Sequence, residues 1–135
     1  MNPKGKRILV LGLGISGMSM VRWLTSRGAI MRVADTRLLP PLAGQLREKF
    51  PDVDLHVGEL EPQVFKGADV VAISPGVPLA QPLVKRARDQ GIPVLGDIEL
   101  FAHARKQYVH SRVIAITGSN GKSTVTEMVG AMCKA

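Results

Sequence analysis

Two segments of this sequence combine glycines with residues that bind phosphates or magnesium. The one nearer the C-terminus is Gly118-Ser119-Asn120-Gly121-Lys122-Ser123-Thr124, which follows an apolar run over residues 113–117. Glycines let consecutive backbone N–H groups point inward, and the N-terminus of a following helix adds positive potential. In such a loop Lys122 would reach the β- and γ-phosphates of a nucleotide, and the Ser123 hydroxyl would bind Mg²⁺. These residues predict a strand over 113–117, a phosphate-binding loop and a helix.

The other segment is Gly12-Leu13-Gly14-Ile15-Ser16-Gly17, a literal G-x-G-x-x-G. It lies between an apolar strand-like run over 7–11 and apolar residues at helical spacing up to Gly28. The next predicted strand, 30–34, ends at Asp35, where a dinucleotide enzyme holds the ribose of NAD. From the residues alone this pattern favours a dinucleotide pocket. The alternative is that Asp35 caps a turn or a helix.

A third loop, Ser74-Pro75-Gly76-Val77-Pro78, follows a predicted buried strand over 68–73. Ligands of open parallel sheets bind beyond the carboxyl ends of the strands, so this loop should lie on the same rim as Gly14 and Asp35. The alternative is a simple turn from strand to helix.

The elements that position these loops alternate between strand and helix from residue 6 to about 104. Helices are expected over 42–50 and 79–90 and after an N-cap at Asp97, strands over 53–57 and 93–95, and irregular chain over 58–67. This order predicts an α/β fold with a Rossmann-like, mostly parallel sheet of about five strands. Residues 105–112 read as a linker, giving a first domain over 1–108 and the start of a second over 109–135.

Composition limits the classes of protein. The chain has 135 residues, 45% hydrophobic and 21% charged, which is enough for one globular domain. It has no apolar run of about 20 residues, so a cytoplasmic protein that does not span a membrane is expected. The net charge of +7 suits an anionic partner, but scattered basic residues and a single Trp and Tyr argue against nucleic acid. His56 is expected to face solvent, and His103, His110 and Cys133 have no metal-ligand spacing.

The C-terminal loop departs from a strict Walker A motif, which has glycine where this chain has Ile116. The loop in this altered form is similar to that of the Mur ligases, and the sequence resembles this family over residues 5–134. The segments that carry the resemblance are Gly12-Leu13-Gly14-Ile15-Ser16-Gly17, Asp35-Thr36-Arg37, Ser74-Pro75-Gly76, Gly96-Asp97-Ile98-Glu99-Leu100-Phe101 and Thr117-Gly118-Ser119-Asn120-Gly121-Lys122-Ser123-Thr124.

The resemblance implies a three-domain, ATP-dependent, amide-bond-forming enzyme of peptidoglycan synthesis. It implies that the first domain binds the UDP part of UDP-N-acetylmuramoyl-L-alanine rather than NAD. The residues it assigns to uracil and the UDP phosphates are Gly14, Ile15, Ser16, Asp35, Thr36, Arg37, Ser74, Pro75 and Gly76. It assigns ATP to Gly118, Ser119, Asn120, Gly121, Lys122, Ser123 and Thr124, with Lys122 as a catalytic group and Mg²⁺ on Ser123 or Thr124.

In the implied reaction, the γ-phosphoryl group of ATP passes to the substrate carboxylate, and the amine of D-glutamate attacks the resulting acyl phosphate. The D-glutamate site and further magnesium ligands are expected beyond residue 135. As an N-terminal portion, the chain is expected to bind UDP weakly, to bind ATP hardly at all and not to catalyse. Two alternatives stay open, an NAD(P)-binding dehydrogenase domain and a non-catalytic UDP-sensing module. The apolar run over 113–117 is expected to be disordered or to promote self-association.

Overall fold

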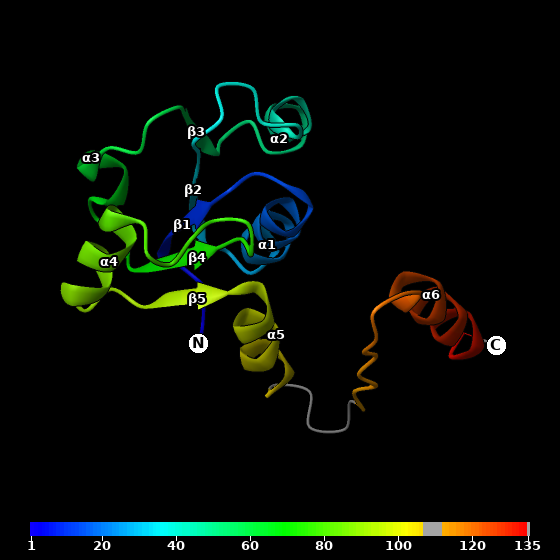
Figure 1. The fold of residues 1–135 in the computed structure, drawn as a ribbon. Helices are drawn as coiled ribbons and strands as arrows, with labels where there is room; N and C mark the ends of the chain where they lie inside the picture. Colours follow the sequence, from blue (N-terminus) through cyan, green and yellow to red (C-terminus); the bar gives the residue numbers. More distant parts are fainter. Residues whose placement is uncertain (107–111, 135) are drawn as a thin grey trace.

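The computed structural model describes residues 1–106 and 112–134. Strands and helices alternate through the first 105 residues, and one further helix follows (Figure 1). The elements are β1 Arg7–Leu11, α1 Ile15–Ser26, β2 Ile30–Asp35, α2 Ala43–Lys49, β3 Asp54–Val57, α3 Pro62–Phe65, β4 Val70–Ile73, α4 Pro82–Asp89, β5 Val94–Gly96, α5 Asp97–Arg105 and α6 Lys122–Met132.

Within the described residues the strands form one five-stranded parallel sheet in the order β3-β2-β1-β4-β5. β1 is central, with Ile8 opposite Met31 of β2 and Val70 of β4. The predicted Rossmann-like α/β sheet is therefore confirmed. Because the chain order reverses on either side of β1, a crevice is expected beyond the carboxyl ends of β1 and β4.

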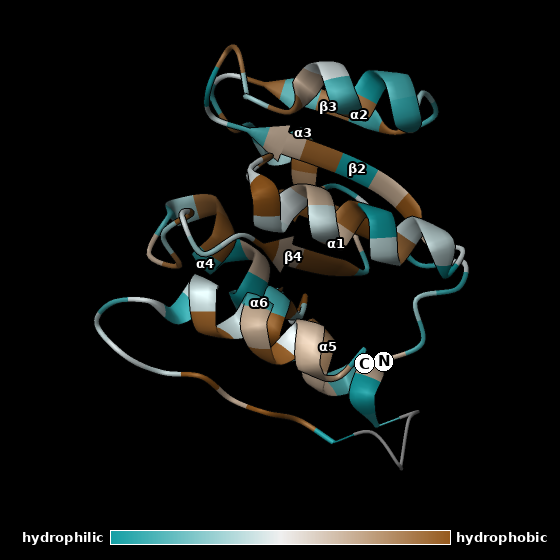
Figure 2. Ribbon diagram, turned by 90° about the vertical axis from the view of Figure 1, so that its right-hand side faces the viewer, coloured by the Kyte–Doolittle hydropathy of each residue, from teal (hydrophilic) through white to brown (hydrophobic). Residues whose placement is uncertain are grey.

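Helices cover both faces of the sheet. Ile8 and Val10 of β1 join the core under α1, α2 and α5, whereas Leu9 and Leu11 join the core under α3 and α4. A strand buried on both faces needs apolar side chains at every position, and β1 has them after Arg7. In Figure 2 the strands are mostly hydrophobic and α2 is mostly hydrophilic.

Three local expectations are wrong in detail. Residues 58–67 are not wholly irregular, because Pro62 opens the one-turn helix α3. Asp97 is not the N-cap of α5 but its first residue, and the Gly96 N–H before it donates to Glu99 Oε2 at 2.7 Å. α4 begins at Pro82 rather than near residue 79, with the Gln81 side chain accepting from the Val84 N–H at 2.9 Å.

The predicted strand over 113–117 is also wrong, because the structure describes these residues and forms no strand there. A parallel strand needs a partner for its N–H and C=O groups, and this apolar run has none in the described structure. Val113 and Ile114 are exposed, and none of the described residues of α6 is buried. α6 lies apart from the sheet in Figure 1. The proposed linker over 105–112 falls mostly outside the described residues, as does His110.

No helix in the described part of the chain is long and apolar enough to cross a membrane.

Candidate functional site

A pocket of about 490 Å³ lies at the carboxyl ends of β1, β2 and β4. This volume is in the range of small-molecule sites. The pocket brings together all nine residues assigned to UDP by sequence, and adds Gly12 and Val77. Its lining residues are Gly12, Gly14, Ile15, Ser16, Asp35, Thr36, Arg37, Ser74, Pro75, Gly76 and Val77.

The carboxylate of Asp35 connects two walls of this pocket. Its side chain is only 3% exposed. Oδ2 accepts from the Leu13 N–H at 2.7 Å and from Arg37 Nη2 at 2.6 Å. Oδ1 accepts from the Arg37 N–H at 2.9 Å and from Arg37 Nε at 2.8 Å. A carboxylate offers about four acceptor positions, so all of those on Asp35 are used within the chain.

These contacts fix the charge state of Asp35. The hydrogen bond from the Arg37 side chain is the largest influence on its pKa, and the N–H groups of Leu13 and Arg37 add to it. Burial acts in the opposite direction, and the pKa of Asp35 falls from 3.8 to about 2. The same contact raises the pKa of Arg37. At neutral pH the site therefore holds an ionised pair whose guanidinium is half-exposed.

The glycine loop packs tightly on one side and is open on the other. A Cβ on Gly17 would lie 1.9 Å from the Gly12 carbonyl oxygen, so α1 and β1 approach as closely as they do only because Gly17 lacks a side chain. A Cβ on Gly14 would meet no atom within 4 Å. Gly14 is the N-cap of α1 and provides no side-chain cap for the first turn. The helix N-terminus beside Gly14 is therefore accessible to an anion.

The Ser74 hydroxyl joins the third loop to the first. Ser74 is buried, and its Oγ donates to the Gly12 carbonyl oxygen at 2.9 Å, while its N–H donates to the Leu11 carbonyl oxygen at 2.9 Å. Its hydroxyl hydrogen is thus committed within the protein, whereas Pro75 and Gly76 are exposed. Gly12 and Val77 were not among the nine residues assigned to UDP, although both belong to the glycine motif and the third loop that the sequence had singled out.

Apart from Asp35 and Arg37, the lining residues of the pocket carry no ionisable side chain. Arg37 and the α1 N-terminus make it suited to bind an anion, and it holds no pair of groups placed for acid–base chemistry.

The predicted ATP residues surround the start of α6. Gly118 and Gly121 have positive φ angles of 150° and 74°, and the helix begins at Lys122. The Lys122 ammonium donates to the Gly118 carbonyl oxygen at 2.6 Å and lies 3.4 Å from that of Ser119. Ser123 and Thr124 are in the first turn, which contains no acidic residue. This stretch is exposed in the described structure, without the strand that would normally precede it.

The remaining titratable candidates that the structure describes do not form a metal-binding cluster. No group of three or more His, Cys, Asp or Glu side chains in the described residues could hold a metal ion. A ring nitrogen of the half-buried His56 lies 3.0 Å from the Glu59 carbonyl oxygen, and Cys133 is an exposed free thiol.

Comparison with protein families matches residues 6–96 to the model described as Mur ligase MurD-like, N-terminal domain. A curated relative from Methylobacillus flagellatus, named UDP-N-acetylmuramoylalanine--D-glutamate ligase, is 52% identical over 132 residues. The match covers 98% of this chain and 29% of that relative, so the chain spans less than a third of its length.

Solved structures show the same fold. A pseudomurein peptide ligase type C from Methanothermus fervidus has a TM-score of 0.62 and 28% identity, covering 96% of this chain and 26% of that one. A shikimate dehydrogenase from Aquifex aeolicus has a TM-score of 0.54 and 21% identity, covering 84% of this chain and 52% of that one. The second likeness concerns the fold alone.

Proposed function

The chain belongs to the Mur ligase family through a MurD-like N-terminal domain, and we propose that its rim pocket binds the UDP part of UDP-N-acetylmuramoyl-L-alanine. One observation carries this proposal: the nine residues assigned to the nucleotide from three separate loops line one pocket. The diphosphate lies at the N-terminus of α1, where Gly14 leaves room for close approach to the backbone. The uracil and ribose lie between the loop after β2 and the loop after β4.

The contacts within the pocket divide these residues by role. Asp35 and Ser74 hold the loops together, because their acceptors and hydroxyl hydrogen are bonded inside the protein. Arg37 is half-exposed and supplies the positive charge that faces the ligand. A ligand group that donates to Asp35 must first displace the Arg37 side chain.

We propose that residues 118–124 bind the phosphates of ATP in the whole protein, as part of a domain that begins near residue 109. The two positive-φ glycines and the helix start at Lys122 fit a nucleotide loop. Lys122 would neutralise phosphate charge, and Ser123 and Thr124 would hold Mg²⁺. Bound ATP supplies the phosphoryl group that activates the substrate carboxylate. The proposed product of the whole protein is the amide formed with D-glutamate.

The second candidate is an NAD(P)-binding dehydrogenase domain, which the glycine motif between β1 and α1 favours. Two features speak against it. Asp35 has no free acceptor for a ribose hydroxyl, and the family match covers the whole pocket.

Calorimetry with UDP, NAD, NADP and ATP distinguishes these functions. We expect UDP to bind weakly and to give the largest response, and ATP hardly to bind. Equal or stronger binding of NAD or NADP would support the dehydrogenase, and tight ATP binding without UDP binding would refute the assignment of the pocket. A sensing module binds UDP like the ligase domain, so activity of the whole protein separates the two.

A further inference from the structure

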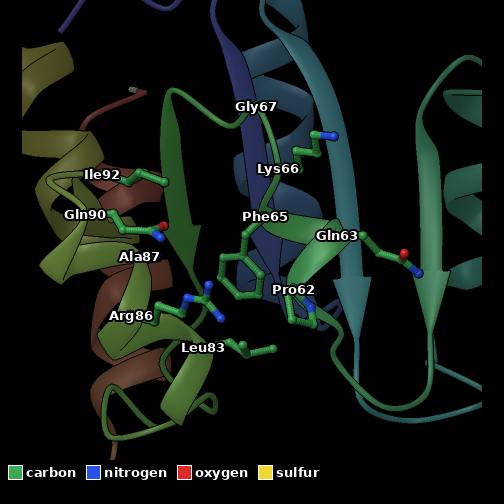
Figure 3. Close-up of a pocket in the computed structure, with 10 residues that line it drawn as sticks. All are labelled: Pro62, Gln63, Phe65, Lys66, Gly67, Leu83, Arg86, Ala87, Gln90 and Ile92. Atoms are coloured by element: carbon green, nitrogen blue, oxygen red, sulfur yellow. The ribbon is translucent and has the colours of Figure 1, made fainter.

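A second hollow, of about 400 Å³, lies between α3 and α4 on the sheet face to which Leu9 and Leu11 belong (Figure 3). It exists because the crossover from β3 to β4 contains only the four-residue helix α3, whereas α4 has eight residues. We call it the α3–α4 groove. Its lining residues are Pro62, Gln63, Phe65, Lys66, Gly67, Leu83, Arg86, Ala87, Gln90 and Ile92. It shares none of them with the rim pocket.

The floor of the groove is apolar. Phe65 and Ala87 are buried in the core, and Leu83 and Ile92 are half-buried beside it. Leu83, Arg86 and Gln90 follow helical spacing, so one stripe of α4 faces α3. In Figure 3 their side chains extend from α4 toward Phe65, whereas Gln63 and Lys66 extend away from Arg86.

The charge over this floor is positive. The guanidinium of Arg86 makes no hydrogen bond or ion pair in the described ranges, although the Arg86 carbonyl oxygen accepts from the Gln90 N–H. None of the lining residues of the groove is acidic. Two acidic residues near the groove already have partners. Glu61 accepts a hydrogen bond from the Gln63 side chain, and the Asp69 carboxylate accepts one from the Arg7 backbone N–H. The Arg86 guanidinium is therefore a cation without a partner in the described structure, beside an apolar floor that is partly exposed at Leu83 and Ile92. A guanidinium in that position selects a carboxylate attached to an apolar group.

We propose that the α3–α4 groove binds a short acidic peptide segment of a partner protein. An apolar side chain of the segment packs on Phe65, Leu83 and Ile92, and a neighbouring carboxylate pairs with Arg86. The Gln90 amide, on the same stripe, hydrogen-bonds the peptide backbone. Because the two sites share no lining residue, this interaction is independent of nucleotide binding.

The test uses a fluorescein-labelled pentapeptide, Glu-Glu-Leu-Phe-Asp, and its counterpart Lys-Lys-Leu-Phe-Lys, with fluorescence anisotropy as the readout. Arg86→Glu is compared with Arg88→Glu, which makes the same charge change on the same helix outside the groove. We expect the acidic peptide to bind the unmodified chain and Arg88→Glu within twofold, and to bind Arg86→Glu at least fivefold more weakly. Circular dichroism and UDP calorimetry check that both variants stay folded.

Backbone amide NMR locates the bound peptide. Shifts concentrated at α3, α4 and Ile92 support the proposal, and shifts elsewhere overturn it. Equal affinity of the two α4 variants, or equal binding of the lysine peptide, also overturns it. Binding of N-acetyl-phenylalanine as tight as that of the peptide would also overturn the proposal, because it would indicate a small carboxylate ligand. Preferential binding of the chain to vesicles of anionic phospholipid would overturn it as well. Self-association that Arg86→Glu abolishes overturns it in favour of a second copy of the chain.

Discussion

The guanidinium of Arg37 contacts both oxygens of the Asp35 carboxylate, at 2.8 Å from Nε to Oδ1 and 2.6 Å from Nη2 to Oδ2. With the Leu13 and Arg37 backbone N–H groups, this pair closes the loop after β2 onto the loop after β1. We therefore expect Asp35 to stabilise the rim directly. Its effect on ligand binding is indirect, because it holds the two loops in place.

The first prediction concerns stability at acidic pH. The pKa of Asp35 is lowered from 3.8 to about 2 on folding, so its stabilising contribution is complete above pH 5 and is lost as pH falls toward 2. The shift corresponds to at most about 2 kcal/mol, because Arg37 is half-exposed and partly screened. Urea unfolding followed from pH 7 to pH 2 should show this loss. Asp35→Asn should be less stable at pH 7 and show a shallower pH dependence. An unchanged slope would contradict the assignment.

The second prediction concerns the charge that faces the ligand. Arg37→Ala removes the only cationic side chain lining the rim pocket in the described structure. A charge-assisted hydrogen bond contributes about 1.5–3 kcal/mol, so UDP affinity should fall roughly tenfold or more. Arg47→Ala on α2, outside the pocket, is the matched control. Equal affinities of the two variants in calorimetry would show that Arg37 does not contact UDP.

The sequence predicted the sheet and the rim because both depend on local signals. Apolar runs bounded by glycines marked the strands, and the rule that ligands lie beyond the carboxyl ends of parallel strands placed Gly14, Asp35 and Ser74 together. What local signals could not predict was the partner of each polar group. Whether Asp35 contacts a ligand or Arg37, and whether Ser74 donates to a ligand or to Gly12, depends on side-chain directions in the folded chain.

The prediction of a strand over residues 113–117 is wrong for a different reason. Its apolar run has strand character, but a strand forms only when a neighbour satisfies its backbone groups. The five described strands are paired with one another, and none pairs with this segment. The short helix α3 was missed because four residues are too few for a periodic pattern.

The third prediction tests Ser74 as a positioning residue. Ser74→Ala leaves the Gly12 carbonyl oxygen without this hydroxyl donor and should lower the free energy of unfolding by about 1 kcal/mol. UDP affinity should fall severalfold, because the loop after β1 is less firmly held. Ser19→Ala, at an exposed site on α1, is the control and should change neither quantity. Loss of affinity without loss of stability would mean that the hydroxyl contacts the ligand directly.

The last prediction separates two glycines of one motif. Gly17→Ala puts a Cβ 1.9 Å from a backbone oxygen that cannot move freely, so it should destabilise the fold by about 3 kcal/mol, as overpacking does. Gly14→Ala meets no protein atom within 4 Å, and at φ −98° an alanine is unstrained. The cost to the fold should therefore be only that of a poorer N-cap on α1, about 1 kcal/mol or less. The added methyl group would instead occupy the space where we propose the diphosphate lies. Thermal unfolding and UDP calorimetry on both variants should therefore give opposite patterns, with a large loss of stability in Gly17→Ala and mainly a loss of affinity in Gly14→Ala. Normal UDP affinity in Gly14→Ala would place the phosphates elsewhere.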